Sequence, residues 1–245
     1  MIEFQDVTIV YNGRSVMDRV SFTAQFHEKI AILGASGEGK TTILKLIVGL
    51  EQPDSGRILI DGTDISSLTE AELRDIRMNF SIVFQEGALF DSLNVRDNVA
   101  FCLGERGKVP EDVVESTVKD LLNRVGIEEA MFLMPDQLSG GMQRRVAIAR
   151  SLAGCKPRMM LYDEPTSGLD PLTDGTIIDL INELSSGDPA ERTGLIIVTH
   201  DVSDAVKVAE RFMYLKNGRI QFDGDLEALK STRDAGLNKF IKDIL

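Results

Sequence analysis

The sequence of 245 residues lacks any apolar run of the roughly 18 residues that a membrane-spanning helix needs. It has only two cysteines, Cys102 and Cys155, which lie far apart and without metal-site spacing; this argues against a disulfide framework and favours a reducing compartment. The first residues have neither a basic flank nor an apolar stretch, so we expect no signal peptide. Any role at a membrane is therefore expected to depend on docking.

Positive charge is scarce relative to negative charge. The sequence has 27 Lys and Arg residues against 39 Asp and Glu residues, a formal net charge of −12. Such a surface repels phosphate backbones and anionic headgroups at long range, so we expect neither nucleic acid nor bare lipid to be the main partner. A local basic pocket for a nucleotide remains compatible with this charge.

The first part of the chain alternates between strand-like runs and turn signals. Residues 2–10 and 20–26 flank Asn12-Gly13, which predicts a hairpin. Residues 29–33 are almost continuously apolar, as expected for a strand covered on both faces, and the pattern after them predicts a helix over residues 42–50. Residues 56–60, followed by a turn at Asp61-Gly62, predict another antiparallel strand.

The middle of the chain has a helical pattern, carried by Val113, Val114, Val118, Leu121, Leu122 and Val125. Two more buried strands are expected at residues 158–162 and 195–199. We therefore predict one α/β domain over residues 1–245. Its core, residues 1–87 and 155–245, has a mainly parallel sheet with an antiparallel β edge, and about residues 88–154 form an inserted α-helical subdomain. Residues 225–245 are expected to pack as one or two helices, on this core or on a second copy.

A glycine-rich loop follows the strand at residues 29–33. It matches GxxxxGK[ST] in full as Gly34-Ala35-Ser36-Gly37-Glu38-Gly39-Lys40-Thr41. The glycines allow backbone N–H groups to converge on a phosphate at a helix N-terminus. Lys40 is expected to reach the β- and γ-phosphates, and the Thr41 hydroxyl to bind Mg²⁺. The fold is therefore predicted to be of the P-loop NTPase type, with ATP held by this loop and Thr42.

Two carboxylates and a histidine follow the later core strands. Asp163 and Glu164 end the apolar run that includes Tyr162, and His200 ends the next one. Ligands of a parallel sheet lie at the carboxyl ends of its strands, so we expect these side chains near the phosphates. Asp163 is predicted to act on the Mg²⁺ side, Glu164 to orient or deprotonate the attacking water, and His200 to contact the γ-phosphate.

The segment Leu138-Ser139-Gly140-Gly141-Met142-Gln143 begins another predicted helix. Ser139 is a good N-cap, and the two glycines leave backbone donors uncovered for an anion. The segment closely resembles the signature motif of ATP-binding cassette (ABC) transporter ATPases, although many relatives have Gln where this chain has Met142. That resemblance covers essentially the whole chain.

The resemblance implies further roles. Gln85 matches the glutamine that senses Mg²⁺, residues 167–170 look like the D-loop that touches a partner subunit, and Tyr11 stands where the family places an aromatic ring under adenine. It also implies a homodimer in which each nucleotide lies between one phosphate loop and the other copy's Ser139, Gly140 and Gly141. The expected catalytic residues are thus Glu164, His200, Gln85 and Lys40, and the expected metal ligands are Thr41, Gln85 and Asp163.

The stretch from Gln85 to Val95, which reads QEGALFDSLNV, resembles the ATPases of Mla-type phospholipid transporters that are linked to MCE-domain proteins. An apolar and aromatic segment of this kind suits a groove for a short permease helix. The resemblance implies an ATPase at the cytoplasmic face of the inner membrane, docked to a permease near residues 85–95, with an MCE-domain protein in the complex. An importer for an amino acid or osmolyte remains an alternative, and a cassette acting on nucleic acid is disfavoured by the net charge. A GTPase is disfavoured because no NKxD motif occurs.

Overall fold

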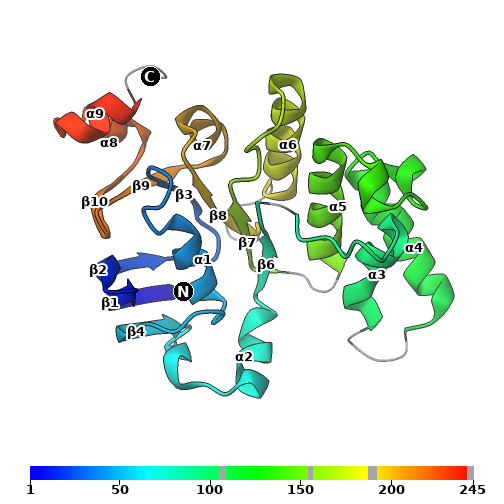
Figure 1. Ribbon diagram of the computed structural model, residues 1–245, viewed down its shortest axis with the longest axis horizontal. Coiled ribbons are helices and arrows are strands. Elements are labelled where there is room, and N and C mark those ends of the chain that lie inside the picture. The colour runs from blue at the N-terminus through cyan, green and yellow to red at the C-terminus, as the bar shows by residue number, and fades with distance from the viewer. Residues whose placement is uncertain (86, 105–108, 154–156, 187–191, 242–245) are drawn as a thin grey trace.

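The computed structural model describes residues 1–85, 87–104, 109–153, 157–186 and 192–241. Its central sheet has the strand order β10-β9-β3-β8-β7-β6 (Figure 1). The strands are β3 (Lys29–Leu33), β6 (Phe80–Val83), β7 (Met159–Asp163), β8 (Gly194–Thr199), β9 (Arg211–Lys216) and β10 (Arg219–Gly224). All pairings are parallel except that of β9 with β10. The predicted strands at residues 29–33, 158–162 and 195–199 are therefore confirmed to within a residue at each end.

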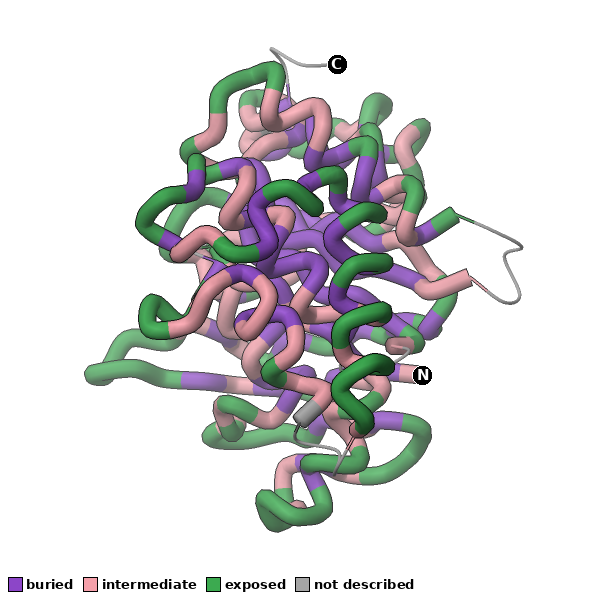
Figure 2. Tube along the Cα trace, turned by 90° about the vertical axis from the view of Figure 1, so that its right-hand side faces the viewer, coloured by how far each residue is buried: buried purple, intermediate pink, exposed green. Residues whose placement is uncertain are grey.

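The middle strands are apolar except at their ends because the sheet has a core on each face. Alternate residues of β3 divide between the two cores: Ala31 and Leu33 pack into one, and Ile30 and Ile32 into the other. Strands β7 and β8 alternate in the same way. Burial on both faces stabilises the continuous apolar runs. Figure 2 shows the buried segments gathered in the middle of the molecule, with mostly exposed segments around them.

A second, antiparallel sheet of order β2-β1-β4-β5 forms one edge of the molecule. It comprises β1 (Ile2–Tyr11), β2 (Arg14–Ala24), β4 (Ser55–Ile60) and β5 (Thr63–Asp64). The expected hairpin turn is confirmed, with Asn12 and Gly13 at φ 50° and 77°. The prediction that the second strand begins at residue 20 was wrong. Register shifts along β1 and β2 break the alternation, and the polar residues from Arg14 onward lie on the solvated face of a ribbon.

Helices α3 (Val95–Gly104), α4 (Glu111–Arg124) and α5 (Gly140–Ala153) lie together at one end of the molecule (Figure 1). Short 3₁₀ segments η2 (Glu128–Ala130) and η3 (Pro135–Gln137) join α4 to α5. The described parts of residues 88–137 contain no strand, in agreement with the helical pattern in this part of the sequence. Val118 and Leu122 are buried at the helical spacing expected, whereas Val113 is 45% exposed because it lies in the first turn of α4, beyond the packed face.

The helix after the phosphate loop, α1 (Lys40–Ile47), begins two residues earlier and ends earlier than predicted. Gly39 and Gly49 bracket it at positive φ, 97° and 65°. At Gly49 a Cβ atom would come within 2.9 Å of the Leu73 side chain on α2 (Glu70–Arg77), so close packing adds to the conformational reason for glycine.

The remaining helices are α6 (Pro171–Leu184), α7 (Val202–Val208), α8 (Leu226–Lys230) and α9 (Ala235–Ile241), with a short 3₁₀ turn η1 (Ile65–Ser67) near α2. Leu229, Leu237 and Ile241 are buried in one of the two cores, and the Phe240 ring lies 5.3 Å from that of Tyr214. The C-terminal segment, up to residue 241, thus packs on its own core. No helix in the described ranges is long and apolar enough to cross a membrane.

Candidate functional site

The phosphate loop connects the end of β3 to the start of α1, and its glycines are required by geometry. Gly37 and Gly39 have φ values of 82° and 97°, a region that favours glycine. Gly34 has no room for a side chain, since a Cβ atom would lie 2.6 Å from the Leu215 carbonyl oxygen. The loop leads directly into the N-terminus of α1, where backbone donors and the helix dipole favour an anion.

Lys40 is the first residue of α1, and its side chain folds back over this loop. It is only 5% exposed. Its Nζ donates hydrogen bonds to the carbonyl oxygens of Gly34 at 2.9 Å and Ala35 at 3.1 Å, and forms an ion pair with Glu164 Oε1 at 3.2 Å. A buried ammonium group is thus held directly over the anion-binding loop, where phosphate oxygens can compete for it.

Thr41 and Asp163 meet at the carboxyl end of β7. The Thr41 hydroxyl donates to Asp163 Oδ1 at 2.9 Å. Burial raises the pKa of Asp163 and the nearby charge of Glu164 adds to this, while the hydrogen bond from Thr41 and the charge of Lys40 lower it. A hydroxyl and a carboxylate oxygen beside a phosphate loop are the hard donors that Mg²⁺ prefers, so these residues fit that ion.

Glu164 and His200 come from the ends of two neighbouring parallel strands, β7 and β8. Glu164 has φ 46°, and its backbone N–H donates to the Val198 carbonyl oxygen, so the chain turns sharply where the strand ends. Its Oε2 atom lies 2.8 Å from His200 Nδ1 and accepts longer hydrogen bonds, each 3.3 Å, from the Thr199 hydroxyl and the His200 backbone N–H. One carboxylate therefore joins Lys40 through Oε1 to His200 through Oε2.

A cavity of about 300 Å³ opens beside the loop, and its lining brings most of the predicted residues together: Tyr11, Val16, Ser36, Gly37, Gly39, Lys40, Thr41, Thr42, Gln85 and Glu164. Gln85 donates to the Ser167 hydroxyl at 3.4 Å, which links it to the predicted D-loop. Glu38 does not line this cavity, because its carboxylate accepts a hydrogen bond from the Asn217 backbone N–H at 2.6 Å.

The predicted signature residues lie elsewhere. Ser139 caps α5, accepting a hydrogen bond from the Met142 backbone N–H at 3.2 Å, and both Ser139 and Gly140 are exposed. None of the three signature residues lines the cavity at the phosphate loop. Gly141 is buried against α6, where a Cβ atom would come within 2.2 Å of Thr173 Cγ2. Close helix packing thus accounts for this glycine, a reason that the sequence pattern did not reveal.

Two residues of the site had not been predicted. Val16 lines the cavity and would contact a Cβ atom at Gly39 at 2.8 Å. Arg144 is buried on α5 and donates to the carbonyl oxygens of Phe84 at 3.3 Å and Ser167 at 3.5 Å. It joins the loops after β6 and β7. A charged residue one turn after Gly140, on the buried face of α5, was the only signal available for Arg144.

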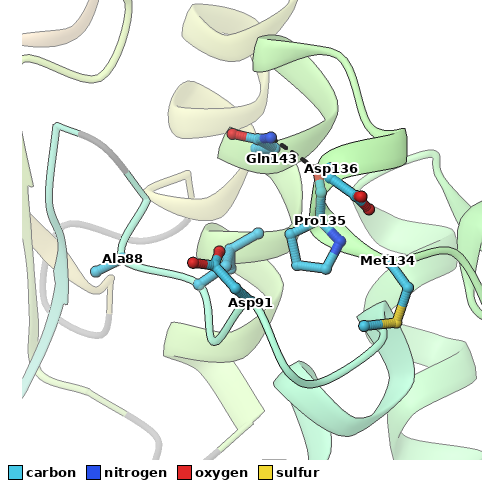
Figure 3. A pocket seen from close by; sticks show the side chains of 7 residues that line it. Ala88, Asp91, Met134, Pro135, Asp136 and Gln143 are labelled. Carbon is cyan, nitrogen blue, oxygen red and sulfur yellow. Dashed lines mark hydrogen bonds between the residues drawn. The ribbon is translucent and has the colours of Figure 1, made fainter.

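A larger cavity, about 570 Å³, lies next to the segment that follows Gln85 (Figure 3). It is lined by Ala88, Leu89, Asp91, Met134, Pro135, Asp136 and Gln143. Gln143 on α5 donates to the Pro135 carbonyl oxygen at 2.8 Å and so fixes η3 against α5. Neither Asp91 nor Asp136 forms an ion pair with any residue in the described ranges.

Comparisons with known proteins agree with this geometry. A family model described as ABC transporter matches residues 17–167. The intermembrane phospholipid transport system ATP-binding protein MlaF of Escherichia coli K12 is 38% identical over 244 residues, covering 100% of this chain and 89% of that protein. The glutamine transport ATP-binding protein GlnQ of the same organism is 37% identical over 246 residues, with 100% of each chain covered. A solved dimeric ATP-binding cassette in a post-hydrolysis state, bound to ADP and Pi, has a TM-score of 0.84 and 32% identity, with 92% of this chain and 99% of that chain covered.

Proposed function

This chain belongs to the ABC transporter family, and we propose that it is the ATP-hydrolysing subunit of a transporter that moves phospholipid between bacterial membranes. The observation that carries the ATPase assignment is the contact chain from Lys40 through Glu164 to His200, placed beside the Thr41–Asp163 pair. Similarity to MlaF proteins along the full chain supports the phospholipid substrate. Similarity to GlnQ, equally complete, supports an amino acid importer as the second candidate.

The geometry supports a specific division of labour in hydrolysis. The phosphates of ATP lie on the backbone N–H groups of the loop, and the adenine ring lies against Tyr11. Lys40 Nζ moves from its carbonyl partners to the β- and γ-phosphate oxygens. Glu164 accepts a proton from the water that attacks the γ-phosphorus as the bond to the β–γ bridging oxygen breaks. His200 holds the second oxygen of Glu164 and contacts the γ-phosphate, so that the carboxylate keeps its orientation.

The Thr41 hydroxyl, Asp163 and the Gln85 amide would hold Mg²⁺ in this site. When bound, the ion neutralises charge that develops on the phosphate oxygens. Asp163 is placed to act partly through water, because its Oδ1 atom already accepts the Thr41 hydroxyl. Gln85 also contacts Ser167, so a change at the nucleotide reaches the D-loop.

A second copy of the chain would complete each nucleotide site. Ser139 and Gly140 are exposed and lie outside the cavity at the phosphate loop, as expected if they serve the nucleotide of a partner. The dimeric state of the solved relative supports this arrangement. Binding of ATP would then close the dimer, and loss of the γ-phosphate contacts would let it reopen. We also propose that residues 88–154 act as a helical subdomain within one domain of residues 1–245.

The larger cavity fits a short segment of an integral-membrane permease. Leu89, Met134 and Pro135 give it apolar walls, and the carboxylates of Asp91 and Asp136 stand at it without cationic partners among the described residues. An occupant of complementary chemistry is a short helix with apolar residues and at least one Lys or Arg. Docked in this way, the chain would lie at the cytoplasmic face of the inner membrane as a peripheral subunit, with an MCE-domain protein in the same complex.

Affinity purification of the Glu164→Gln variant from detergent-solubilised membranes tests this proposal. The variant is expected to keep ATP binding and to lose hydrolysis by about 100-fold or more, because the base is gone while the loop and Lys40 remain. An integral-membrane permease with an MCE-domain partner is expected to copurify. A solute permease would instead support the importer. Hydrolysis at the wild-type rate would remove Glu164 from its role, and no copurifying membrane protein would contradict the transporter assignment.

A further inference from the structure

Two carboxylates on different helices face each other behind the site. Asp204 on α7 is 1% exposed. Its Oδ2 atom accepts a hydrogen bond from the Thr166 hydroxyl at 2.7 Å, and its Oδ1 atom contacts Lys207 Nζ at 3.2 Å. The carboxyl group of Asp174 on α6 lies against that of Asp204, and its buried Oδ1 atom accepts no hydrogen bond from an N–H or hydroxyl group in the described part of the chain. We refer to Asp174 and Asp204 as the carboxyl pair.

A buried carboxylate oxygen without a donor is costly unless the group holds a proton. Burial, followed by the charge of Asp204 and the hydrogen bond to it, raises the pKa of Asp174 to about 6. Lys207 opposes this rise and Asp201 adds to it. These charged groups lie on α7 or at its N-cap, and the α5 residue that approaches Thr173 of α6 is the uncharged Gly141. When Asp174 is protonated, its O–H group can donate a hydrogen bond to Asp204. When Asp174 loses this proton, two negative charges are left in contact.

Asp204 connects the two segments that carry the reacting groups. Thr166 follows Glu164 by two residues, and α7 begins just after His200. The Thr166–Asp204 hydrogen bond is buried, so it ties the loop after β7 to the helix after β8. Given the proposed function, we infer that Asp204 is a positioning residue for ATP hydrolysis. A proton shared between Asp204 and Asp174 strengthens the attachment of Asp204 to the loop that bears Glu164.

The ratio of kcat for the Asp174→Asn variant to kcat for the wild type, measured on the full chain with MgATP from about pH 5.5 to 8, tests this inference. Asparagine is isosteric and keeps a donor toward Asp204 at every pH. The ratio is expected to be close to one at the acidic end and to rise by about fivefold at the basic end, with KM for ATP unchanged. Any pH dependence that the two proteins share cancels in the ratio.

A second variant separates positioning from general stability. Thr166→Val removes the hydroxyl that Asp204 binds and keeps the shape of the side chain. Thr166→Val should lower kcat at every pH. When Asp174→Asn is added to Thr166→Val, the ratio of kcat for the double variant to kcat for Thr166→Val should no longer vary with pH. The inference would be overturned if the wild type is active and the ratio of Asp174→Asn to wild type does not vary with pH. It would also be overturned if the corresponding ratio in the Thr166→Val background still varies. Wild-type protein without ATPase activity would instead overturn the proposed function.

Thermal melting gives an independent readout. Because the folded pKa of Asp174 is raised, its contribution to stability is present at low pH and is lost as the pH rises through about 6. Between pH 3.8 and about pH 6, the melting temperature of the wild type should therefore fall relative to that of Asp174→Asn. Identical melting curves across the window would also contradict the shared proton.

Discussion

The two halves of the proposed nucleotide site differ in how complete they are within one chain. At the phosphate loop, Lys40, Glu164 and His200 are joined by contacts of 2.8 to 3.2 Å, and the first two are buried. At the start of α5, Ser139 and Gly140 are exposed, Ser139 caps the helix, and the next residue, Gly141, packs on α6. The first half is organised for chemistry within the chain, whereas the second is organised as a surface.

The largest effect is expected from a mixture of two inactive variants. Lys40→Ala removes the buried ammonium group over the loop, and Ser139→Arg blocks the start of α5. Each variant alone is expected to lose nearly all ATPase activity. In a mixed dimer, one of the two sites combines an intact loop with an intact signature. A one-to-one mixture should therefore recover about a quarter of the wild-type rate.

Steady-state ATPase measurements on the separate and mixed proteins check this outcome, with native mass spectrometry to count the mixed dimers. If mixed dimers form and the rate does not recover, the two halves do not work across copies. Substantial ATP binding by Lys40→Ala would count against the role given to the loop.

A smaller effect is expected at the packed face of the signature helix. Gly141→Ala would place a methyl group 2.2 Å from Thr173 Cγ2, so it should destabilise the fold by about 1–3 kcal/mol and displace α5 from α6. Gly140→Ala meets only Leu169 at 3.4 Å and should cost less. Adding Thr173→Ser removes the obstructing methyl group and keeps the hydroxyl, and should restore most of the loss. Urea unfolding of the four proteins measures this, and equal stability of the two alanine variants would contradict the packing explanation.

The smallest effect on the chain itself is expected at the larger cavity. Asp91→Lys and Asp136→Lys reverse its charge, and each should weaken copurification with the permease by about tenfold while leaving the ATPase rate of the isolated chain unchanged. Asp112→Lys, on α4 and outside the cavity lining, is the matched control for net charge. Unchanged copurification of both cavity variants would mean that the cavity does not receive the permease.

Much of the fold could be predicted because its signals are local. A few consecutive residues are enough to predict a buried strand or a phosphate loop. This holds for the apolar runs of β3, β7 and β8 and for the glycines of the phosphate loop. The dependence of Gly141 on Thr173 and the approach of Val16 to the loop could not be predicted, because each depends on a distant segment. The start of β2 was missed for a related reason, since bulges interrupt its alternation. The cassette fold as a whole agrees with the solved relatives.

One buried guanidinium has a mechanical consequence. Arg144 projects from α5 to the carbonyl oxygens of Phe84, the neighbour of Gln85, and of Ser167. The Arg144 side chain therefore couples the position of α5 to the positions of both loops. If α5 tilts, the loop that leads toward the larger cavity and the loop that follows Glu164 must shift in step, or the guanidinium must give up one of its acceptors.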